Sequence, residues 1–313
     1  MTEIPAICGP TGSGKTALSL MLAAEFDMEI ISADSMQIYR YMDIGTAKAT
    51  LEERERVRHH LIDVIDPDVA YSAEAYREAA LAAISDVSSR GKKTLIVGGT
   101  GLYVDTLMRS PSGEVPASSP EYREKILSGI RSEEDKDALW QRLYEVDAPS
   151  AEKTHKNNVK RVIRALEIYD TTGKPKSYWD KISLDRPGLP IRLFVLDFHN
   201  REILYERIDR RVDIMFDMGL ADEVKELLNM GYLRGGDTAS SAIGYKELLD
   251  YLDGKCTLEF AKDSIKLASR RYAKRQQTWF NHNEDAIHIF MDDGERMRPT
   301  DEVYRDVRAF MLG

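Results

Sequence analysis

Short runs of apolar and β-branched residues alternate along the chain with longer segments in which apolar residues recur at helical spacing. Four of these runs predict buried strands, at Ile4–Cys8, 29–33, 94–97 and 192–198. Helical periodicity follows the first run, over 15–26, and precedes the third, over 71–90. Strands that alternate with helices form parallel sheets, so the pattern predicts an α/β fold around a parallel sheet.

The middle of the chain breaks this alternation. Between 110 and 120 the composition changes abruptly to Ser, Pro and Gly, which predicts a linker. Helical periodicity without a strand candidate then continues to about Trp179. We therefore expect a core formed by 1–114 and 191–313, whose C-terminal part over 201–280 is helical, and a mainly helical insertion over 115–190.

Composition narrows the class of protein. The chain has 313 residues, 42% of them hydrophobic, which is enough to bury a full core and excludes disorder. The net charge of −9 argues against nonspecific binding of polyanions by the whole surface, so any nucleic-acid contact must use local basic patches. Two distant cysteines, Cys8 and Cys256, offer no disulfide framework. With no leader-like start and no membrane-length apolar run, we expect a cytoplasmic protein.

A glycine-rich loop follows the first predicted strand and precedes a predicted helix. It matches the pattern G-x-x-x-x-G-K-T, which places backbone N–H groups, a lysine and a hydroxyl around phosphate oxygens. Lys15 supplies a cation, and the Thr16 hydroxyl can ligate Mg²⁺. The loop by itself indicates a nucleoside triphosphate or another diphosphate ester and identifies no reaction. The predicted phosphate-binding residues are Gly9, Pro10, Thr11, Gly12, Ser13, Gly14, Lys15 and Thr16.

Two further strand ends bring polar groups toward the same edge of the sheet. Asp34 follows the second strand and is a candidate general base; the alternatives are a helix cap or a ligand of metal-bound water. After the third strand, a glycine-rich turn over 98–103 carries the hydroxyl of Thr100. His59 and His60 are adjacent, so their side chains diverge and structural use is favoured over metal ligation.

These segments in combination resemble the tRNA dimethylallyltransferase family, also called tRNA isopentenyltransferases or IPP transferases. The resemblance covers nearly the whole chain in the order of the family. The matching blocks are 9–16, 31–37, 42–48, 59–63, 98–103, 160–167, 242–247 and 273–280.

The resemblance implies a P-loop NTPase-like parallel sheet core with an inserted, mainly helical domain. It also implies transfer of a dimethylallyl group from dimethylallyl diphosphate to N6 of the adenosine that is 3′-adjacent to the anticodon. The loop would then hold the donor's diphosphate with Mg²⁺ and would not cleave ATP. Asp34 would be the base at N6, Thr100 would bind near the reacting groups, and an arginine of 205–211, for which we choose Arg211, would neutralise the diphosphate.

The RNA partner is expected to be the anticodon stem-loop of tRNA. The segment from Lys262 to Phe280 contains six basic residues and one acidic residue. On a helix, Lys262, Lys266, Arg270 and Lys274 would form one basic stripe. We expect the helical insertion to clamp the anticodon stem-loop. We also expect the protein to be a monomer. The predicted tRNA-binding residues are Asp34, Ser35, Met36, Gln37, Lys160, Arg161, Val162, Ile163, Arg164, Gly244, Lys246, Lys274, Arg275 and Gln276.

Two other functions compete with this interpretation. A P-loop kinase of a nucleoside or small metabolite would use the same loop on ATP and an acid after the second strand as its base. A non-enzymatic RNA-binding module would explain the basic stripe but not the carboxylate and hydroxyl that converge on the phosphate loop.

Overall fold

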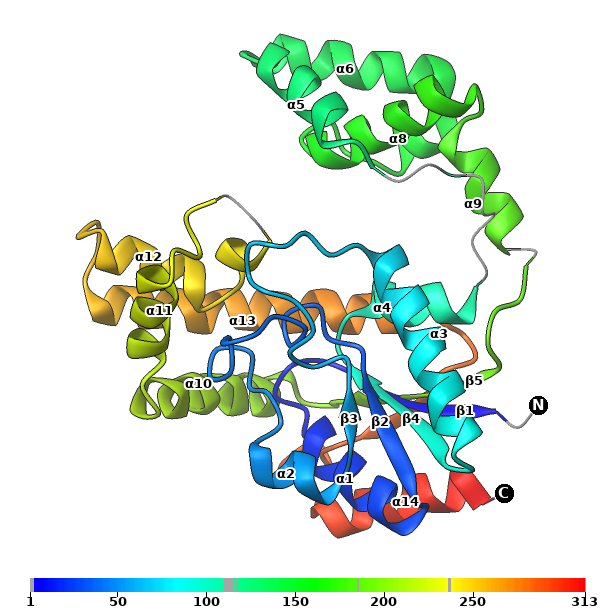
Figure 1. Cartoon of the computed structure of the whole chain (residues 1–313), viewed down its shortest axis with the longest axis vertical. Helices are drawn as coiled ribbons and strands as arrows, with labels where there is room; N and C mark the ends of the chain where they lie inside the picture. The colour runs from blue at the N-terminus through cyan, green and yellow to red at the C-terminus, as the bar shows by residue number, and fades with distance from the viewer. Residues whose placement is uncertain (1–2, 110–114, 116–117, 185, 236–237, 313) are drawn as a thin grey trace. The chain divides into compact units, whose positions relative to one another are not determined.

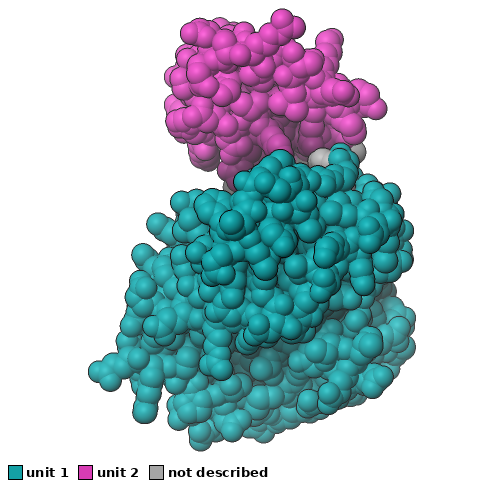
Figure 2. All heavy atoms as spheres, turned by 90° about the vertical axis from the view of Figure 1, so that its left-hand side faces the viewer, with its two compact units in different colours: residues 1–107, 190–313 teal, residues 108–189 magenta. Residues whose placement is uncertain are grey.

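The computed structural model describes residues 3–109, 115, 118–184, 186–235 and 238–312. It divides into two compact units, one formed by Met1–Leu107 with Pro190–Gly313 and the other by Met108–Leu189 (Figure 2). The expected insertion, 115–190, therefore begins later in the chain than the second unit does. Most of the predicted linker over 110–120 lies outside the described residues. No helix in the described part of the chain is both long and apolar enough to cross a membrane.

A six-stranded parallel sheet forms the centre of the first unit, in the order β3-β2-β4-β1-β5-β6 (Figure 1). Four strands lie within one residue of their predicted bounds: β1 (Ile4–Cys8), β2 (Met28–Ser32), β4 (Lys93–Gly98) and β5 (Ile191–Asp197). The predicted parallel α/β core is confirmed. Sequence reasoning missed the two outer strands, β3 (His59–His60) and β6 (Ile287–Phe290), because β3 is too short to show periodicity and His288 interrupts the apolar residues of β6.

Helices pack on the sheet and cover its apolar residues. Helix α1 (Lys15–Glu25) follows β1 and packs beside α14 (Thr300–Leu312), while α3 (Ala73–Ser89) contacts β2 and β4 (Figure 1). Helix α1 buries Leu18 and Leu22 in the main core, and Val303 and Val307 of α14 join the same core. The short helices α2 (Leu51–Arg56) and α4 (Gly101–Met108) complete this part of the chain.

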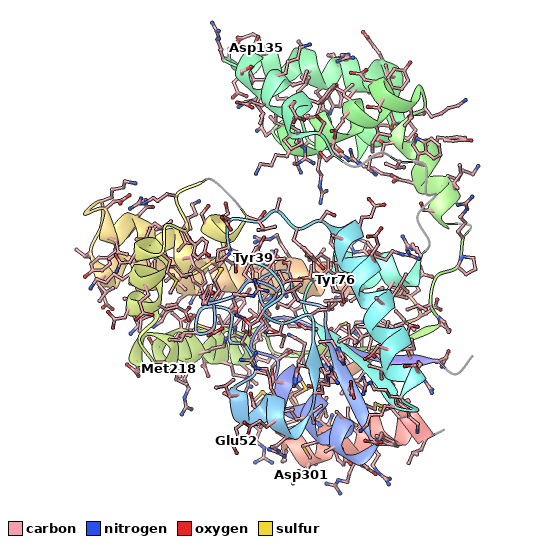
Figure 3. All side chains as sticks on the ribbon, in the orientation of Figure 1. Tyr39, Glu52, Tyr76, Asp135, Met218 and Asp301 are labelled. Atoms are coloured by element: carbon pink, nitrogen blue, oxygen red, sulfur yellow. The ribbon has the colours of Figure 1, made fainter. Side chains whose placement is uncertain are left out.

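The region over 201–280 is helical, as predicted, but it is interrupted by turns. It contains α10 (Arg201–Asp217), α11 (Leu220–Asn229), a short 3₁₀ turn (Ala239–Ser241), α12 (Tyr245–Leu252) and α13 (Leu258–Phe280). These helices share a second core with the segment that follows β2, in which Tyr39 is buried (Figure 3). The α10–α13 layer therefore closes over the edge of the sheet where the strands end.

Among its described residues, the second unit contains helices and one isolated bridge between Arg109 and Pro187. Its helices are α5 (Pro120–Gly129), α6 (Glu133–Val146), α7 (Ala148–Glu152), α8 (Val159–Thr172) and α9 (Lys176–Leu184). Helix α8 buries Val162, Ala165 and Leu166 against Leu143 of α6, which gives the unit a core of its own. Buried Glu167 accepts a hydrogen bond from the backbone N–H of Ser119 and so fixes the start of α5.

Candidate active site

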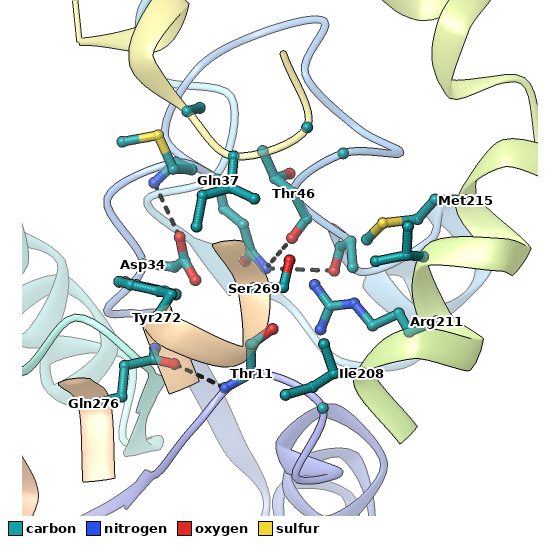
Figure 4. Close-up of a pocket in the computed structure, with 18 of the residues that line it drawn as sticks. Thr11, Asp34, Gln37, Thr46, Ile208, Arg211, Met215, Ser269, Tyr272 and Gln276 are labelled. Atoms are coloured by element: carbon teal, nitrogen blue, oxygen red, sulfur yellow. Dashed lines mark hydrogen bonds between the residues drawn. The ribbon is translucent and has the colours of Figure 1, made fainter. Parts of the chain in front are cut away.

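A cavity of about 630 Å³ lies in the first unit, beside the carboxyl ends of β1 and β2. The glycine-rich loop and the start of α1 form one wall, the segment after β2 a second, and α10 with α13 the others (Figure 4). Parallel sheets place their ligands at this edge, where successive strand ends and helix N-termini meet. The cavity therefore joins the predicted phosphate loop to Asp34.

The phosphate loop is held from both ends by hydrogen bonds. The Lys15 ammonium donates to the carbonyl oxygens of Gly9 at 3.0 Å and Pro10 at 2.8 Å. From α10, Arg207 Nε donates to the Gly12 carbonyl at 2.9 Å. Gly9 has a φ of +142°, and a Cβ at this position would lie 2.6 Å from the Leu196 carbonyl oxygen. The backbone of the loop can therefore follow this path only with glycine at its first position.

Three charged side chains act on one another across the cavity. Burial lowers the pKa of Lys15 to about 8, and the Asp34 carboxylate partly opposes this shift. Burial also lowers the pKa of Arg211, again opposed by Asp34. Figure 4 shows Arg211 and Asp34 entering the cavity from opposite sides. Two cations near the phosphate loop thus face one carboxylate, which suits a ligand with an anionic end and a group that can lose a proton.

Backbone hydrogen bonds set the orientation of Asp34. Its Oδ1 accepts from the backbone N–H of Met36 at 2.9 Å. The backbone N–H of Ser35, which lies between these two residues, donates to Thr100 Oγ1 at 3.0 Å. Thr100 Oγ1 also donates to Ser35 Oγ at 3.3 Å. Thr100 and Asp34 are therefore brought together at the sheet edge, but the Thr100 side chain bonds to Ser35, the residue next to Asp34.

Sequence reasoning missed the carboxylate that supports the neighbouring wall. Glu223 on α11 accepts from the backbone N–H groups of Asp43, Ile44 and Gly45, at 2.9, 2.7 and 3.1 Å. Its Oε1 also accepts from the Tyr245 hydroxyl at 2.6 Å. Three adjacent N–H groups on one carboxylate hold this loop, which carries cavity-lining residues, in a single conformation.

The four basic residues predicted to form a stripe lie on α13, but three of them have acidic partners on α10. Lys262 and Lys266 both pair with Asp213 of α10, at 2.9 and 2.7 Å. Arg270 pairs with Asp209 one turn earlier on α10. These three cations therefore pair with two acids of the neighbouring helix. Asp209 and Asp213 are about 50 to 60 residues away in the sequence, so their match to α13 could not be seen from the local pattern. Lys274 and Arg275, at the other end of α13, are exposed.

The predicted tRNA-binding residues fall into different environments. Ser35, Met36, Gln37, Gly244 and Arg275 line the cavity together with Asp34. In the second unit Lys160 and Arg161 are exposed, whereas Arg164 pairs with Glu167 at 2.7 Å. Two of the predictions need correction, because Val162 and Ile163 are each 1% exposed and pack inside this unit, where their side chains are inaccessible to RNA.

Helix α13 contributes a row of cavity-lining side chains, of which sequence reasoning singled out only Gln276 as a binding residue. Ile265, Ser269, Tyr272 and Gln276 recur every three or four residues and line the cavity along one face of the helix. Burial and the charge of Asp34 raise the pKa of Tyr272 to about 12, so its hydroxyl keeps its proton at neutral pH. The helical spacing could have indicated this face, but only the tertiary structure shows that it turns toward a ligand cavity.

The oxygen groups beside the loop fit a Mg²⁺ ion that arrives with a diphosphate. Thr16 and Asp34 line both the main cavity and a small adjoining pocket that also contains Ser32. Within the described ranges, no group of three or more His, Cys, Asp or Glu residues is placed to hold a metal. Mg²⁺ commonly takes one or two protein oxygens and completes its shell with water and phosphate, so these few donors are sufficient.

The adjacent histidines have structural partners. His60 Nε2 lies 2.7 Å from Glu29 Oε2, and His59 Nδ1 lies 2.7 Å from the Val57 carbonyl oxygen. Both residues form β3 at the edge of the sheet. Their role is thus to attach this short strand to β2 and to the chain that precedes it.

A glycine-rich loop of the phosphate-binding pattern on a parallel sheet, facing a carboxylate across a cavity that also contains cationic side chains, defines the chain as an α/β enzyme of the P-loop class. Comparison with known proteins specifies the family. A family model described as IPP transferase matches residues 37–283. A tRNA dimethylallyltransferase of Shouchella clausii is 47% identical, over 100% of this chain and 99% of the relative. One from Caldanaerobacter subterraneus is 44% identical, over 99% and 98%.

Solved structures agree with these relatives. A tRNA isopentenylpyrophosphate transferase of Bacillus halodurans has a TM-score of 0.73 and 40% identity, over 100% of this chain and 96% of that chain. A eukaryotic dimethylallyltransferase acting on tRNA has a TM-score of 0.79 and 31% identity, over 94% and 75%. The chain belongs to the IPP transferase family, the tRNA dimethylallyltransferases, and is a prenyl-transferring enzyme. The competing P-loop kinase is not favoured.

Proposed function

We propose that the protein transfers the dimethylallyl group of dimethylallyl diphosphate to N6 of the adenosine that is 3′-adjacent to the anticodon, with release of diphosphate. The observation that carries this proposal is the cavity in which Lys15 and Arg211 face Asp34. An anionic leaving group and a proton acceptor are the two things that this transfer requires of the protein. We also propose that the protein acts on tRNA as a monomer in the cytoplasm.

The diphosphate binds at the cationic end of the cavity. Backbone N–H groups of the loop and the N-terminus of α1 face it, and Lys15, Arg207 and Arg211 supply positive charge. Charge accumulates on the diphosphate as the allylic C–O bond breaks, and each donor aimed at it can contribute about 3 kcal/mol in a site that excludes water. Thr16 would contribute a hydroxyl ligand to a bound Mg²⁺ ion, which would supply further neutralisation of this charge.

The five-carbon group extends away from the phosphates, along α10. Ile208 lies beside the loop, and Val212 and Met215 follow on the same face of the helix. Ala242 and Ile265 line this part of the cavity from the adjoining segments. An apolar group gains free energy when it is buried against such side chains, so the cavity matches a ligand with one charged and one apolar end.

Asp34 takes the proton that leaves the acceptor amine. The exocyclic amine of adenine is a weak nucleophile, because its lone pair is delocalised into the ring. The allylic carbon therefore develops cationic character as the C–O bond breaks, and the C–N bond forms to it. The nitrogen then releases one proton, which the Asp34 carboxylate accepts. Diphosphate leaves with the bonding electron pair, so charge is balanced.

The acceptor adenosine must leave the stacked anticodon loop to reach Asp34. Exposed Lys246, Lys274 and Arg275 in the first unit, and Lys160 and Arg161 in the second, offer cations to the RNA backbone. We propose that the helical second unit clamps the anticodon stem-loop. Proteolysis of the segment over 110–120 with and without tRNA tests this clamp, since bound RNA is expected to protect the segment and unchanged cleavage would count against the proposal.

Mass spectrometry of nucleosides tests the transfer. Unmodified tRNA is incubated with the protein, Mg²⁺ and dimethylallyl diphosphate, then digested to nucleosides. The expected product is an adenosine that carries one additional C5H8 unit, at the position next to the anticodon. A matched tRNA with guanosine at that position is the control and should stay unmodified. Consumption of ATP with no loss of the prenyl donor would overturn the proposal.

A further inference from the structure

One buried amide connects two loops of the active site. Gln276 on α13 is 5% exposed, although its neighbours Lys274 and Arg275 are exposed. Its Oε1 accepts from the backbone N–H of Thr11 at 2.8 Å, and its Nε2 donates to the Gly99 carbonyl oxygen at 2.8 Å (Figure 4 shows the first bond). Both ends of the side chain are therefore bonded to backbone groups of this protein.

The two loops follow adjacent strands and meet at this amide. Thr11 belongs to the phosphate loop after β1, and Gly99 to the turn after β4; Cys8 of β1 pairs directly with Gly98 of β4. A Cβ on Gly99 would lie 2.2 Å from Gln276 Nε2, so only glycine leaves room for the amide. The fit between Gly99 and Gln276 is thus a specific one.

The turn that holds Gln276 also holds the proposed base. Thr100, next to Gly99, donates from its backbone N–H to the Ala33 carbonyl at 3.0 Å. Its side chain accepts from the N–H of Ser35 at 3.0 Å, so the residues on both sides of Asp34 are bonded to Thr100. A continuous path of hydrogen bonds and short chain segments therefore runs from Thr11, through Gln276 and Thr100, to the Asp34 segment.

We propose that Gln276 is a positioning residue, which sets the phosphate loop and the Asp34 segment at the separation that transfer requires. The inference rests on the proposed function, in which one loop holds the leaving group and the other segment holds the base. Gln276 touches neither RNA nor the reacting atoms in this role. A reaction between two bound partners depends on their alignment, and a misplacement of about 1 Å can reduce its rate about 100-fold.

The alternative role for Gln276 is a direct contact with tRNA, as for its basic neighbours. The bonds that its Oε1 and Nε2 already make to Thr11 and Gly99 argue against this role. Breaking either internal bond to free such an atom would also leave a buried backbone group of Thr11 or Gly99 without its partner. If Gln276 is a positioning residue, its loss should lower the transfer rate and leave RNA affinity intact. If it contacts RNA, its loss should lower RNA affinity.

The first test compares Gln276→Met with Gln277→Met. The two glutamines are adjacent on α13, and Gln277 Nε2 donates to Asp197 Oδ1 at 2.8 Å, outside the cavity lining. We expect Q276M to lower the single-turnover rate by about 10- to 100-fold at saturating donor and anticodon stem-loop RNA. Filter binding of the same RNA should be unchanged. Q277M should keep the wild-type rate, and thermal melting of both variants shows whether each folds.

The second test uses Gln276→Glu, which retains an acceptor for Thr11 but places a carboxylate oxygen against the Gly99 carbonyl. A protonated carboxyl can donate to that carbonyl, and a buried carboxyl protonates more readily than an exposed one. The rate of Q276E relative to wild type should therefore recover as the pH falls from about 8 to about 6. The corresponding ratio for Q276M should not change with pH.

Three results separate the possibilities. If wild-type protein prenylates tRNA and Q276M is equally fast, the positioning role is overturned while the proposed function stands. Loss of RNA binding by Q276M with a normal rate at saturation would identify an RNA contact instead. No transfer by the wild-type protein would overturn the proposed function itself. Should Q276M not fold, the pH response of Q276E decides the question.

Discussion

The backbone N–H of Ser35 donates to Thr100 Oγ1 at 3.0 Å, which attaches the residue after Asp34 to the turn that follows β4. The next N–H, that of Met36, donates to Asp34 Oδ1. The carboxylate is therefore oriented by bonds to the backbone on its own segment and by a hydroxyl from a neighbouring strand end. A carboxylate held in this way loses little entropy when it meets a ligand.

Asp34→Asn removes the proton acceptor and preserves the shape of the side chain. We expect the single-turnover rate to fall by about 10²- to 10⁴-fold, the usual contribution of general-base catalysis. RNA affinity, measured by filter binding, should stay at the wild-type value. Asp68→Asn changes an exposed carboxylate that does not line the cavity and serves as the control. An unimpaired D34N rate would remove Asp34 from the role of base.

Donor capture should depend on pH through Lys15. Its pKa is lowered to about 8, so in the free enzyme the side chain is a cation below that pH and neutral above it. Because the diphosphate is attracted by the cation, kcat/KM for the donor should fall as the pH rises through about 8. Bound diphosphate favours the protonated form, so kcat should change less over the same range. Lys15→Arg stays charged and should lack this decline; an identical decline in K15R would assign it to another group.

Salt dependence of RNA binding should distinguish the two ends of α13. Lys274 is exposed, whereas Lys266 pairs with Asp213 at 2.7 Å. Lys274→Ala should reduce the slope of log K against log salt by about one unit, since it removes one phosphate contact. Lys266→Ala should leave the slope unchanged. Equal effects of the two substitutions would show that the ion pair with α10 opens when RNA binds.

Gly99→Ala should have the same effect as loss of Gln276. The added methyl group would lie 2.2 Å from Gln276 Nε2 and would displace the amide. We expect a reduced single-turnover rate, and no additional loss when G99A is combined with Gln276→Ala, because both changes break one connection. Gly129→Ala is the control, since a Cβ there meets no atom within 4 Å. Fully additive losses would mean that the two residues act independently.

Met215 should limit the length of the prenyl group. It lies on the apolar side of the cavity, one turn beyond Arg211 on α10. Met215→Ala opens space there, so the ratio of geranyl to dimethylallyl transfer should rise by about tenfold or more, as measured by nucleoside mass spectrometry. Met218→Ala is the control, because Met218 lies at the end of the same helix and its side chain is 60% exposed (Figure 3). A ratio unchanged in M215A would place the prenyl group elsewhere in the cavity.

Local motifs carried most of what could be predicted. The spacing of glycines, Lys15 and Thr16 requires only a strand before it and a helix after it, so the phosphate loop is readable from adjacent residues. The buried strands β1, β2, β4 and β5 are likewise visible as uninterrupted apolar runs. In contrast, β3 has too few residues to carry a pattern and His288 interrupts the apolar run of β6, so both strands became visible only through their pairing with a neighbouring strand.

By itself, then, the sequence determined the class of the core, the loop that binds phosphate and the carboxylate at the strand end, because each depends on neighbours along the chain. Only the tertiary structure decided which charges are available. It pairs Lys262 and Lys266 with an acid on α10 and buries Gln276 between two loops. Such partners lie tens to hundreds of residues apart, and hydrogen bonds and ion pairs form between groups that are close in space, whatever their separation along the chain.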